Sequence, residues 1–127
     1  MRYFTIHTAS RDCFTNITPL VAQAVEDLGT RDGVVTVFVP HTTCGVTINE
    51  NADPDVVTDM LAALGRMVPQ EAGYCHREGN SAAHVKASLM GASVQVIVDG
   101  GRLQLGTWQG IYLCEFDGPR TRRVWVR

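Results

Sequence analysis

The last third of the chain constrains the fold most, because it consists of strand-like runs separated by tight turns. Gly100-Gly101 separates two alternating runs, and such a pair is typical of a β-hairpin. Asp117-Gly118-Pro119 separates two further runs. Strands joined by turns this short pair in the antiparallel direction. We therefore expect a mainly antiparallel β-sheet, formed in this region by residues 93–99, 102–105, 107–116 and 121–127.

Signals for two to three helices occur earlier in the chain. Thr18-Pro19 predicts a helix start, in which the threonine side chain accepts from a free backbone N–H, and Gly29 predicts its end. Asp53-Pro54 predicts the start of a second helix, and a shorter third one is expected from Ser81 to near Gly91. The apolar stripes expected on the first two helices are Leu20, Ala24, Val25 and Leu28, and Val57, Met60, Leu61, Leu64 and Val68. Further strands are expected at residues 2–8, at 34–39, and around Val46 and Ile48.

Helices grouped ahead of a run of strands indicate the α+β class, and 127 residues leave room for a single compact domain, residues 1–127. The net charge of −2 offers no field to attract nucleic acid or an anionic membrane. No apolar run is long enough to cross a bilayer, and residues 1–7 lack the apolar stretch of a signal peptide. The four cysteines lie more than 30 residues apart, so we expect reduced thiols in a cytoplasmic protein.

Histidines are the first candidates for chemistry. His41, His76 and His84 fall at turns or helix starts, and three imidazoles meeting at one point would form a site for zinc or a similar divalent ion. Their spacing matches no recognised metal motif, so helix capping and surface hydrogen bonding remain an alternative. A second metal hypothesis places Mg²⁺ and a substrate phosphate on Glu50 and Asp53, although Asp53 is also expected to cap a helix.

Three other side chains are candidates for binding or catalysis. Lys86, the only lysine, could bind a phosphate or be a solvated helix residue. Arg120 belongs to a basic tail that could bind an anion or form a solvated edge strand. Cys44 follows His41 by three residues, which suggests a Cys–His nucleophile, but the two groups must also meet in space.

Three stretches of the sequence together resemble the YjbQ-like family, the secondary thiamine-phosphate synthases. They are His41-Thr42-Thr43 with residues 47–54, Glu78-Gly79-Asn80 with residues 84–88, and Gly106-Thr107-Trp108-Gln109-Gly110-Ile111. The resemblance implies an α+β homotrimer with its polar pocket near a subunit boundary. It also implies a weak ability to join a pyrimidine pyrophosphate to a thiazole phosphate. The family's polar positions fall on His41, Asn49, Glu50, Asp53, His76, His84, Lys86, Trp108 and Gln109.

The sequence departs from the family pattern at one place, and this changes which residues are expected to form the site. Many members have Asp-Asp-Met-Pro before the second motif's histidine, whereas this chain has the shorter Asn80-Ser81-Ala82-Ala83, without those carboxylates. A site centred on histidines therefore becomes more important. We expect catalytic residues at His84, Glu50, His41 and Lys86, and a divalent metal ion, zinc or magnesium, on His41, His76 and His84. A small phosphorylated metabolite would contact Asn49, Asp53, Trp108, Gln109 and Arg120. The alternatives are a non-catalytic protein that binds a metal ion or phosphometabolite, and a metal-assisted hydrolase.

Overall fold

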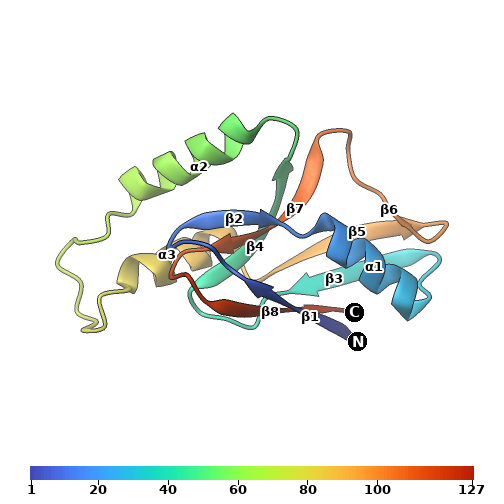
Figure 1. Cartoon of the computed structure of the whole chain (residues 1–127), viewed down its shortest axis with the longest axis horizontal. Coiled ribbons are helices and arrows are strands. Elements are labelled where there is room, and N and C mark those ends of the chain that lie inside the picture. Colours follow the sequence, from blue (N-terminus) through green and yellow to red (C-terminus); the bar gives the residue numbers. More distant parts are fainter.

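Eight strands and three helices make up the computed structural model, which describes residues 1–127 (Figure 1). In chain order the elements are β1 (Arg2–His7), β2 (Cys13–Asn16), α1 (Thr18–Leu28), β3 (Gly33–Phe38), β4 (Cys44–Glu50), α2 (Pro54–Met67), α3 (Ser81–Met90), β5 (Ser93–Asp99), β6 (Arg102–Leu103), β7 (Gln109–Glu115) and β8 (Thr121–Val126). The predicted α+β class is confirmed. None of the three helices has the length and apolar character needed to cross a membrane.

The strands form two antiparallel sheets where the sequence predicted one. The five-stranded sheet has the order β1-β8-β3-β5-β6, and the three-stranded sheet has the order β2-β7-β4. The second sheet depends on β2, which was not predicted because its four residues are flanked by polar sequence and show no clear alternation. Gly100 and Gly101 both have positive φ and form the predicted hairpin turn between β5 and β6.

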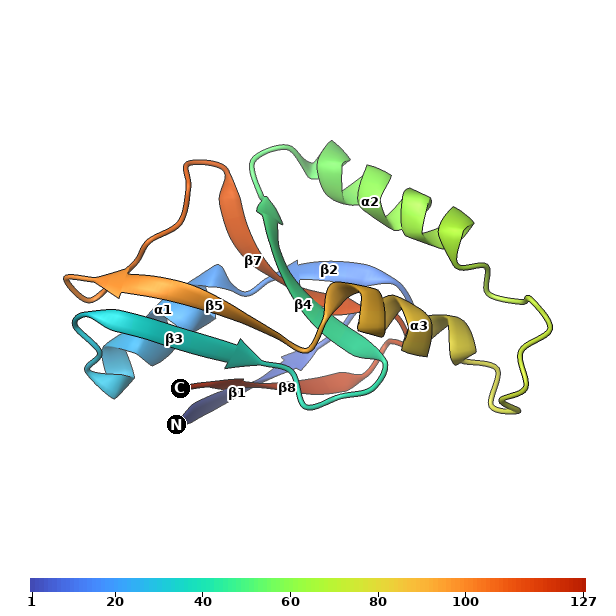
Figure 2. The ribbon, with the colours of Figure 1, turned by 180° about the vertical axis from the view of Figure 1, so that it is seen from behind.

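The main core lies between the two sheets and α1. It contains sixteen buried residues, among them Val37 and Val124 of the larger sheet, Val46 and Leu113 of the smaller one, and Val21 of α1. A smaller cluster on the other face of the three-stranded sheet packs Ala83 and Ala87 of α3 against Tyr112, Cys114 and Phe116. The three-stranded sheet is therefore covered on both faces, and α3 is the outer layer above it (Figure 2).

The helix ends were predicted more accurately than the helix faces. Gly29 ends α1 in the left-handed conformation and Asp53 caps α2 by accepting from the backbone N–H of Asp55 at 2.9 Å, as predicted. Thr18 does not cap α1: its hydroxyl donates to Asn16 Oδ1 and accepts from the backbone N–H of Ile111. Leu20 is exposed and Val21 is buried in its place, because the buried stripe of α1 begins one residue later than predicted.

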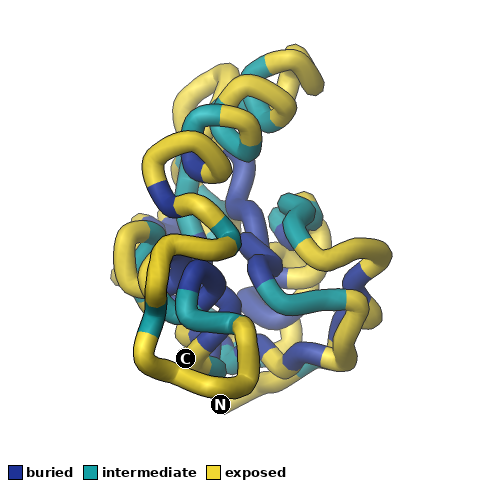
Figure 3. The backbone as a smooth tube through the Cα atoms, turned by 90° about the vertical axis from the view of Figure 1, so that its left-hand side faces the viewer, coloured by how far each residue is buried: buried dark blue, intermediate teal, exposed yellow.

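Helix α2 projects from the rest of the molecule (Figure 1). Leu64 is its only buried residue, whereas Val57, Met60 and Leu61 of the predicted stripe are half-buried. The tube view shows most of this helix as exposed or intermediate (Figure 3). The sequence therefore predicted the helix correctly, and within one chain only Leu64 and Val68 of its apolar stripe are buried.

Candidate functional site

Side chains from four separate segments line one polar cavity of about 520 Å³. The loop between β3 and β4, the loop between α2 and α3, the first turn of α3, and the turn between β7 and β8 with the start of β8 contribute to it. The lining residues are Pro40, His41, Thr42, Thr43, His76, Glu78, Asn80, His84, Asp117, Arg120 and Arg122. The structure thus brings His41, His76, His84 and Arg120 of the predicted site to a single cavity.

His76 and His84 form a close pair among the residues that line this cavity. Their ring centroids are 5.6 Å apart and their planes are nearly perpendicular. Nε2 of His76 lies 3.8 Å from a carboxylate oxygen of Glu78. His84 is held in place by the start of α3, where its backbone N–H donates to the carbonyl of Asn80 at 3.3 Å. The pair therefore brings two imidazoles together, and that of His76 lies next to a carboxylate.

His41 is held by a contact with the backbone of β8. The backbone N–H of Arg123 donates to its Nε2 at 2.8 Å. Burial, and secondarily the charge of Arg122, lower the pKa of His41 below its ordinary value. No three His, Cys, Asp or Glu side chains come together in an arrangement that could hold a metal ion. The predicted ligand set is therefore not formed in this chain, and metal binding stays a prediction.

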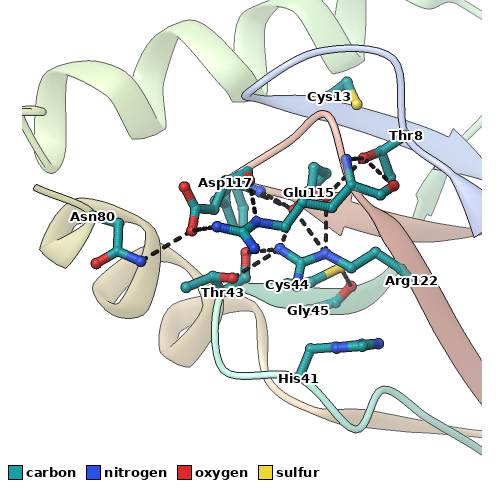
Figure 4. Close-up of polar contacts among 12 residues, drawn as sticks. Thr8, Cys13, His41, Thr43, Cys44, Gly45, Asn80, Glu115, Asp117 and Arg122 are labelled. Atoms are coloured by element: carbon teal, nitrogen blue, oxygen red, sulfur yellow. Dashed lines mark hydrogen bonds and ion pairs between the residues drawn. The ribbon is translucent and has the colours of Figure 1, made fainter. Parts of the chain in front are cut away.

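Arg122, which lines the cavity, belongs to a buried ion pair (Figure 4). Glu115 at the end of β7 is fully buried, and its carboxylate accepts from Nε of Arg122 at 2.9 Å and from the hydroxyl of Thr8 at 2.7 Å. Nη2 of Arg122 also donates to the hydroxyl of Thr43 at 2.8 Å. Burial alone would lower the pKa of Arg122, but the hydrogen bonds and charge of Glu115 outweigh it, so this pKa is raised. Arg122 is therefore a fixed cation.

Asp117 connects this ion pair to other lining residues of the cavity. Its backbone N–H donates to Glu115, and its carboxylate accepts from Nδ2 of Asn80 at 3.0 Å and from Nη2 of Arg120 at 3.1 Å. The site predicted from the sequence did not include the lining residues Asp117, Arg122 and Asn80, nor Glu115, which is buried behind Arg122. A carboxylate at the end of the apolar run 110–116 was the signal that could have identified Glu115, because charged side chains are rarely buried without a partner.

A second cavity, of about 490 Å³, shares His41, Thr42 and His84 with the first. Its other lining residues are Cys44, Ala87, Ser88, Gly91 and Ala92. Burial raises the pKa of the Cys44 thiol to about 12, with a further contribution from the charge of Glu115. This thiol stays protonated at neutral pH, so Cys44 does not meet the requirement for a nucleophile.

The other predicted residues lie at the far end of the three-stranded sheet. Glu50 ends β4, six residues along the strand from Cys44, which corresponds to about 20 Å. Gln109 is its pairing partner at the start of β7, and Trp108 is 62% exposed on the adjoining loop. Asn49 and Asp53 belong to the same end. The expectation that Glu50 lies near the histidines is therefore wrong for a single chain.

Lys86 lies away from the cavity as well. It is 4% exposed, and its Nζ forms an ion pair with Asp12 at 2.7 Å. The same ammonium group lies 5.8 Å from the ring centroid of Phe116. Both interpretations of this lysine were incomplete, because it is neither a solvated residue nor a free cation for a phosphate.

Comparisons with known proteins extend over the whole chain. The family model described as UPF0047 protein YjbQ-like matches residues 2–127. The UPF0047 protein YugU of Bacillus subtilis is 50% identical over 128 residues, which cover 100% of this chain and 97% of YugU. A UPF0047 protein of Methanocaldococcus jannaschii is 45% identical over 124 residues, which cover 98% of this chain and 90% of that protein.

Solved structures agree with these relatives. The crystal structure of an uncharacterized conserved protein of the YjbQ/UPF0047 family from Clostridium acetobutylicum has a TM-score of 0.98 and 54% identity, with 100% of this chain and 98% of that chain covered. A YbjQ-like protein of unknown function from Sulfolobus solfataricus has a TM-score of 0.94 at 32% identity, with 98% and 92% covered. These similarities extend to both ends of the three-stranded sheet.

Proposed function

This chain belongs to the YjbQ-like UPF0047 family, and from that premise we propose that it is a thiamine-phosphate synthase-like transferase. The reaction joins a pyrimidine pyrophosphate to a thiazole phosphate and releases pyrophosphate. The similar proteins are described as uncharacterized or of unknown function, so the support comes from the cavities of this chain and from the resemblance of its motifs.

The pair of adjoining cavities is the observation that carries the proposal. A reaction between two substrates needs two neighbouring places whose contents can meet, and His41, Thr42 and His84 form the wall that both cavities share. The first cavity has no hydrophobic lining residue and contains three histidines together with Arg120, whose guanidinium is more than half exposed although it also contacts Asp117, and this set suits a pyrophosphate group. The second is lined in part by Ala87, Gly91 and Ala92, which suits a ring with fewer charges.

The chemistry requires positioning and charge stabilisation rather than a nucleophile from the protein. The thiazole nitrogen supplies an electron pair to the methylene carbon of the pyrimidine, and the carbon–oxygen bond to pyrophosphate breaks with its electron pair on oxygen. No proton has to move in this step. Arg120 and the imidazoles beside it would stabilise the departing oxygens. The roles proposed here belong to side chains of this chain, in which no group of three metal ligands comes together.

The experiment is a synthase assay on protein purified from a host that lacks its own thiamine-phosphate synthase. We expect thiamine phosphate above background, and we expect His84→Ala to lose most of the activity. His7→Ala is the matched control, because His7 is an exposed histidine of β1 that contacts Thr121 outside both cavities. Absence of product contradicts the synthase. Stoichiometric binding of either substrate without turnover favours the alternative, a non-catalytic phosphometabolite-binding protein.

The metal alternatives have a separate measurement. Elemental analysis of the native protein shows whether zinc or magnesium accompanies it in stoichiometric amount. A metal-assisted hydrolase would need such an ion and would hydrolyse a panel of phosphoesters without the second substrate. Formation of thiamine phosphate by metal-free protein would contradict the metal-assisted hydrolase.

We also propose that the chain assembles as a homotrimer. The support is the outer face of the five-stranded sheet, where Tyr3 and Phe38 flank Trp125 across three neighbouring strands, and Val34 and Ile97 are more than half exposed. Light scattering after size-exclusion chromatography measures the mass directly. A trimer is expected for the unaltered chain, and a monomer at all concentrations contradicts it.

A further inference from the structure

The two ring nitrogens of His41 lie in different surroundings. Nε2 accepts from the backbone N–H of Arg123 at 2.8 Å, and a backbone N–H can only donate. Nε2 is therefore unprotonated. A neutral imidazole carries one proton, so in this geometry the proton is on Nδ1.

Nδ1 of His41 has no hydrogen-bond partner in the chain and is not enclosed. The hydrogen bonds of the protein include one to His41, and that one is made to Nε2. Nδ1 is also not among the buried polar atoms without a partner, of which Oδ1 of Asn80 is the only one. The ring lines both cavities. His41 therefore carries one free N–H donor on a ring that lines both cavities.

The surroundings of His41 keep this tautomer in place. A proton on Nε2 would break the contact with Arg123 whether the ring is neutral or charged, and a ring protonated on both nitrogens would put a second positive charge beside Arg122. Glu115 carries the opposite charge, but its carboxylate is already bound to Arg122, Thr8 and two backbone N–H groups. Burial and the charge of Arg122 together lower the pKa of His41, which agrees with a neutral ring at pH 7.

We propose that His41 is a fixed Nδ1–H donor to an oxygen of bound pyrophosphate, and that it neither ligates a metal ion nor accepts a proton during the reaction. The proposal rests on the proposed function, because pyrophosphate is the leaving group of that reaction. The donor strengthens its contact as the carbon–oxygen bond breaks and the electron pair moves to the pyrophosphate oxygen, while the proton stays on Nδ1. The register of β8, which places the N–H of Arg123, is what sets the donor's direction.

The tautomer can be tested without any activity. Long-range proton–nitrogen NMR of the free protein at pH 7.5 distinguishes protonated from unprotonated ring nitrogens, and the spectrum of His41→Gln identifies which signals belong to His41. We expect a protonated Nδ1 and an unprotonated Nε2. An Nε2–H tautomer, or a doubly protonated ring at this pH, overturns the proposal.

Two matched variants test the donor itself. In His41→Gln the side-chain oxygen can take the place of Nε2 as acceptor for Arg123, whereas the Nδ1 donor is lost. In His41→Asn the side-chain amide can take the place of the Nδ1 donor, whereas the acceptor is lost. We measure binding of pyrophosphate in metal-free buffer by calorimetry. We expect His41→Gln to bind about tenfold more weakly with stability close to that of the unaltered chain. His41→Asn should bind nearly as well as the unaltered chain but unfold at a lower temperature.

The outcomes separate this proposal from the proposed function. Equal binding of pyrophosphate by His41→Gln and the unaltered chain overturns the donor role, and so does a complete lack of binding by the unaltered chain. A protein that shows the tautomer and the weakened binding of His41→Gln, yet forms no thiamine phosphate, keeps the donor role and contradicts the synthase.

Discussion

The two ends of the β4–β7 pair hold their polar side chains in different ways. At the Cys44–Glu115 end, a buried carboxylate, a buried guanidinium and two threonine hydroxyls fix one another and the wall of the cavity. At the Glu50–Gln109 end, polar groups are held by short local contacts, such as Gln109 to the backbone N–H of Gly106, and Trp108 faces solvent. At the Cys44–Glu115 end, contacts within one chain fix the polar side chains. At the Glu50–Gln109 end, polar and apolar side chains remain exposed and can contact another molecule.

The largest expected difference between the two ends concerns their glutamates. Glu115→Ala leaves Arg122 buried without its counter-charge, which costs about 3–5 kcal/mol of the free energy of unfolding. Glu50→Ala at the other end is expected to change it by about 0.5 kcal/mol or less. Urea unfolding measures both.

Glu115→Gln provides a second measurement if Glu115→Ala does not fold, because the amide keeps the shape and loses the charge. Its stability should lie between those of Glu115→Ala and the unaltered chain. Equal losses for the Glu115 and Glu50 variants would contradict the contrast between the two ends.

Gly45 tests the packing of the Cys44–Glu115 end. A Cβ at this position would lie 2.9 Å from the carbonyl oxygen of Gly91 and 2.9 Å from Cβ of Met90, so α3 and β4 would have to separate. We expect Gly45→Ala to lower the free energy of unfolding by about 1–3 kcal/mol. An unchanged midpoint of thermal unfolding would show that α3 is not held this closely.

Gly65 gives the opposite result on the projecting helix. A Cβ at Gly65 meets no atom within 4 Å, and alanine is the better residue inside a helix. Gly65→Ala is expected to raise the free energy of unfolding by about 0.5–1 kcal/mol in the isolated chain. A loss of stability would show that this face of α2 packs against another surface.

The smallest effect is the response of the Cys44–Glu115 end to acid. The pKa of His41 is lowered from its ordinary value of 6.5 in the folded protein, so the unfolded chain binds the proton more readily. The stabilising contribution of a neutral His41 is therefore complete above pH 6.5 and is lost as the pH falls toward the lowered value. Unfolding of the unaltered chain and of His41→Gln is compared between pH 7.5 and 5. A steeper loss in His41→Gln would contradict the assignment.

Local signals in the sequence were sufficient for most elements. Ser93–Asp99 was predicted to the residue, and Asp53 and Gly29 were correctly placed at helix ends, because capping and left-handed turns depend on a few neighbouring residues. Strand β2 and the separation into two sheets depend on pairing with β7, almost a hundred residues later in the chain. The four residues of β2 contain no local sequence signal that predicts this pairing.

The candidate site could be predicted only in part for a related reason. His41, His76 and His84 were identified by residue type and by their places at turns, and they do line one cavity. The residues that hold the cavity together, such as Glu115, Asp117 and Asn80, act through contacts between distant segments. Lys86 was misjudged because its partner Asp12 lies 74 positions away.

Strand β7 lies at the centre of the three-stranded sheet, and this position determines how its backbone amides exchange with solvent. Residues 112–115 are buried and pair with β2 on one side and β4 on the other, so each amide proton is held against one of these neighbours and cannot reach water while both strands stay in register. Their exchange with deuterium should require unfolding of the whole molecule. Amides of α2 should exchange through local fraying, orders of magnitude sooner.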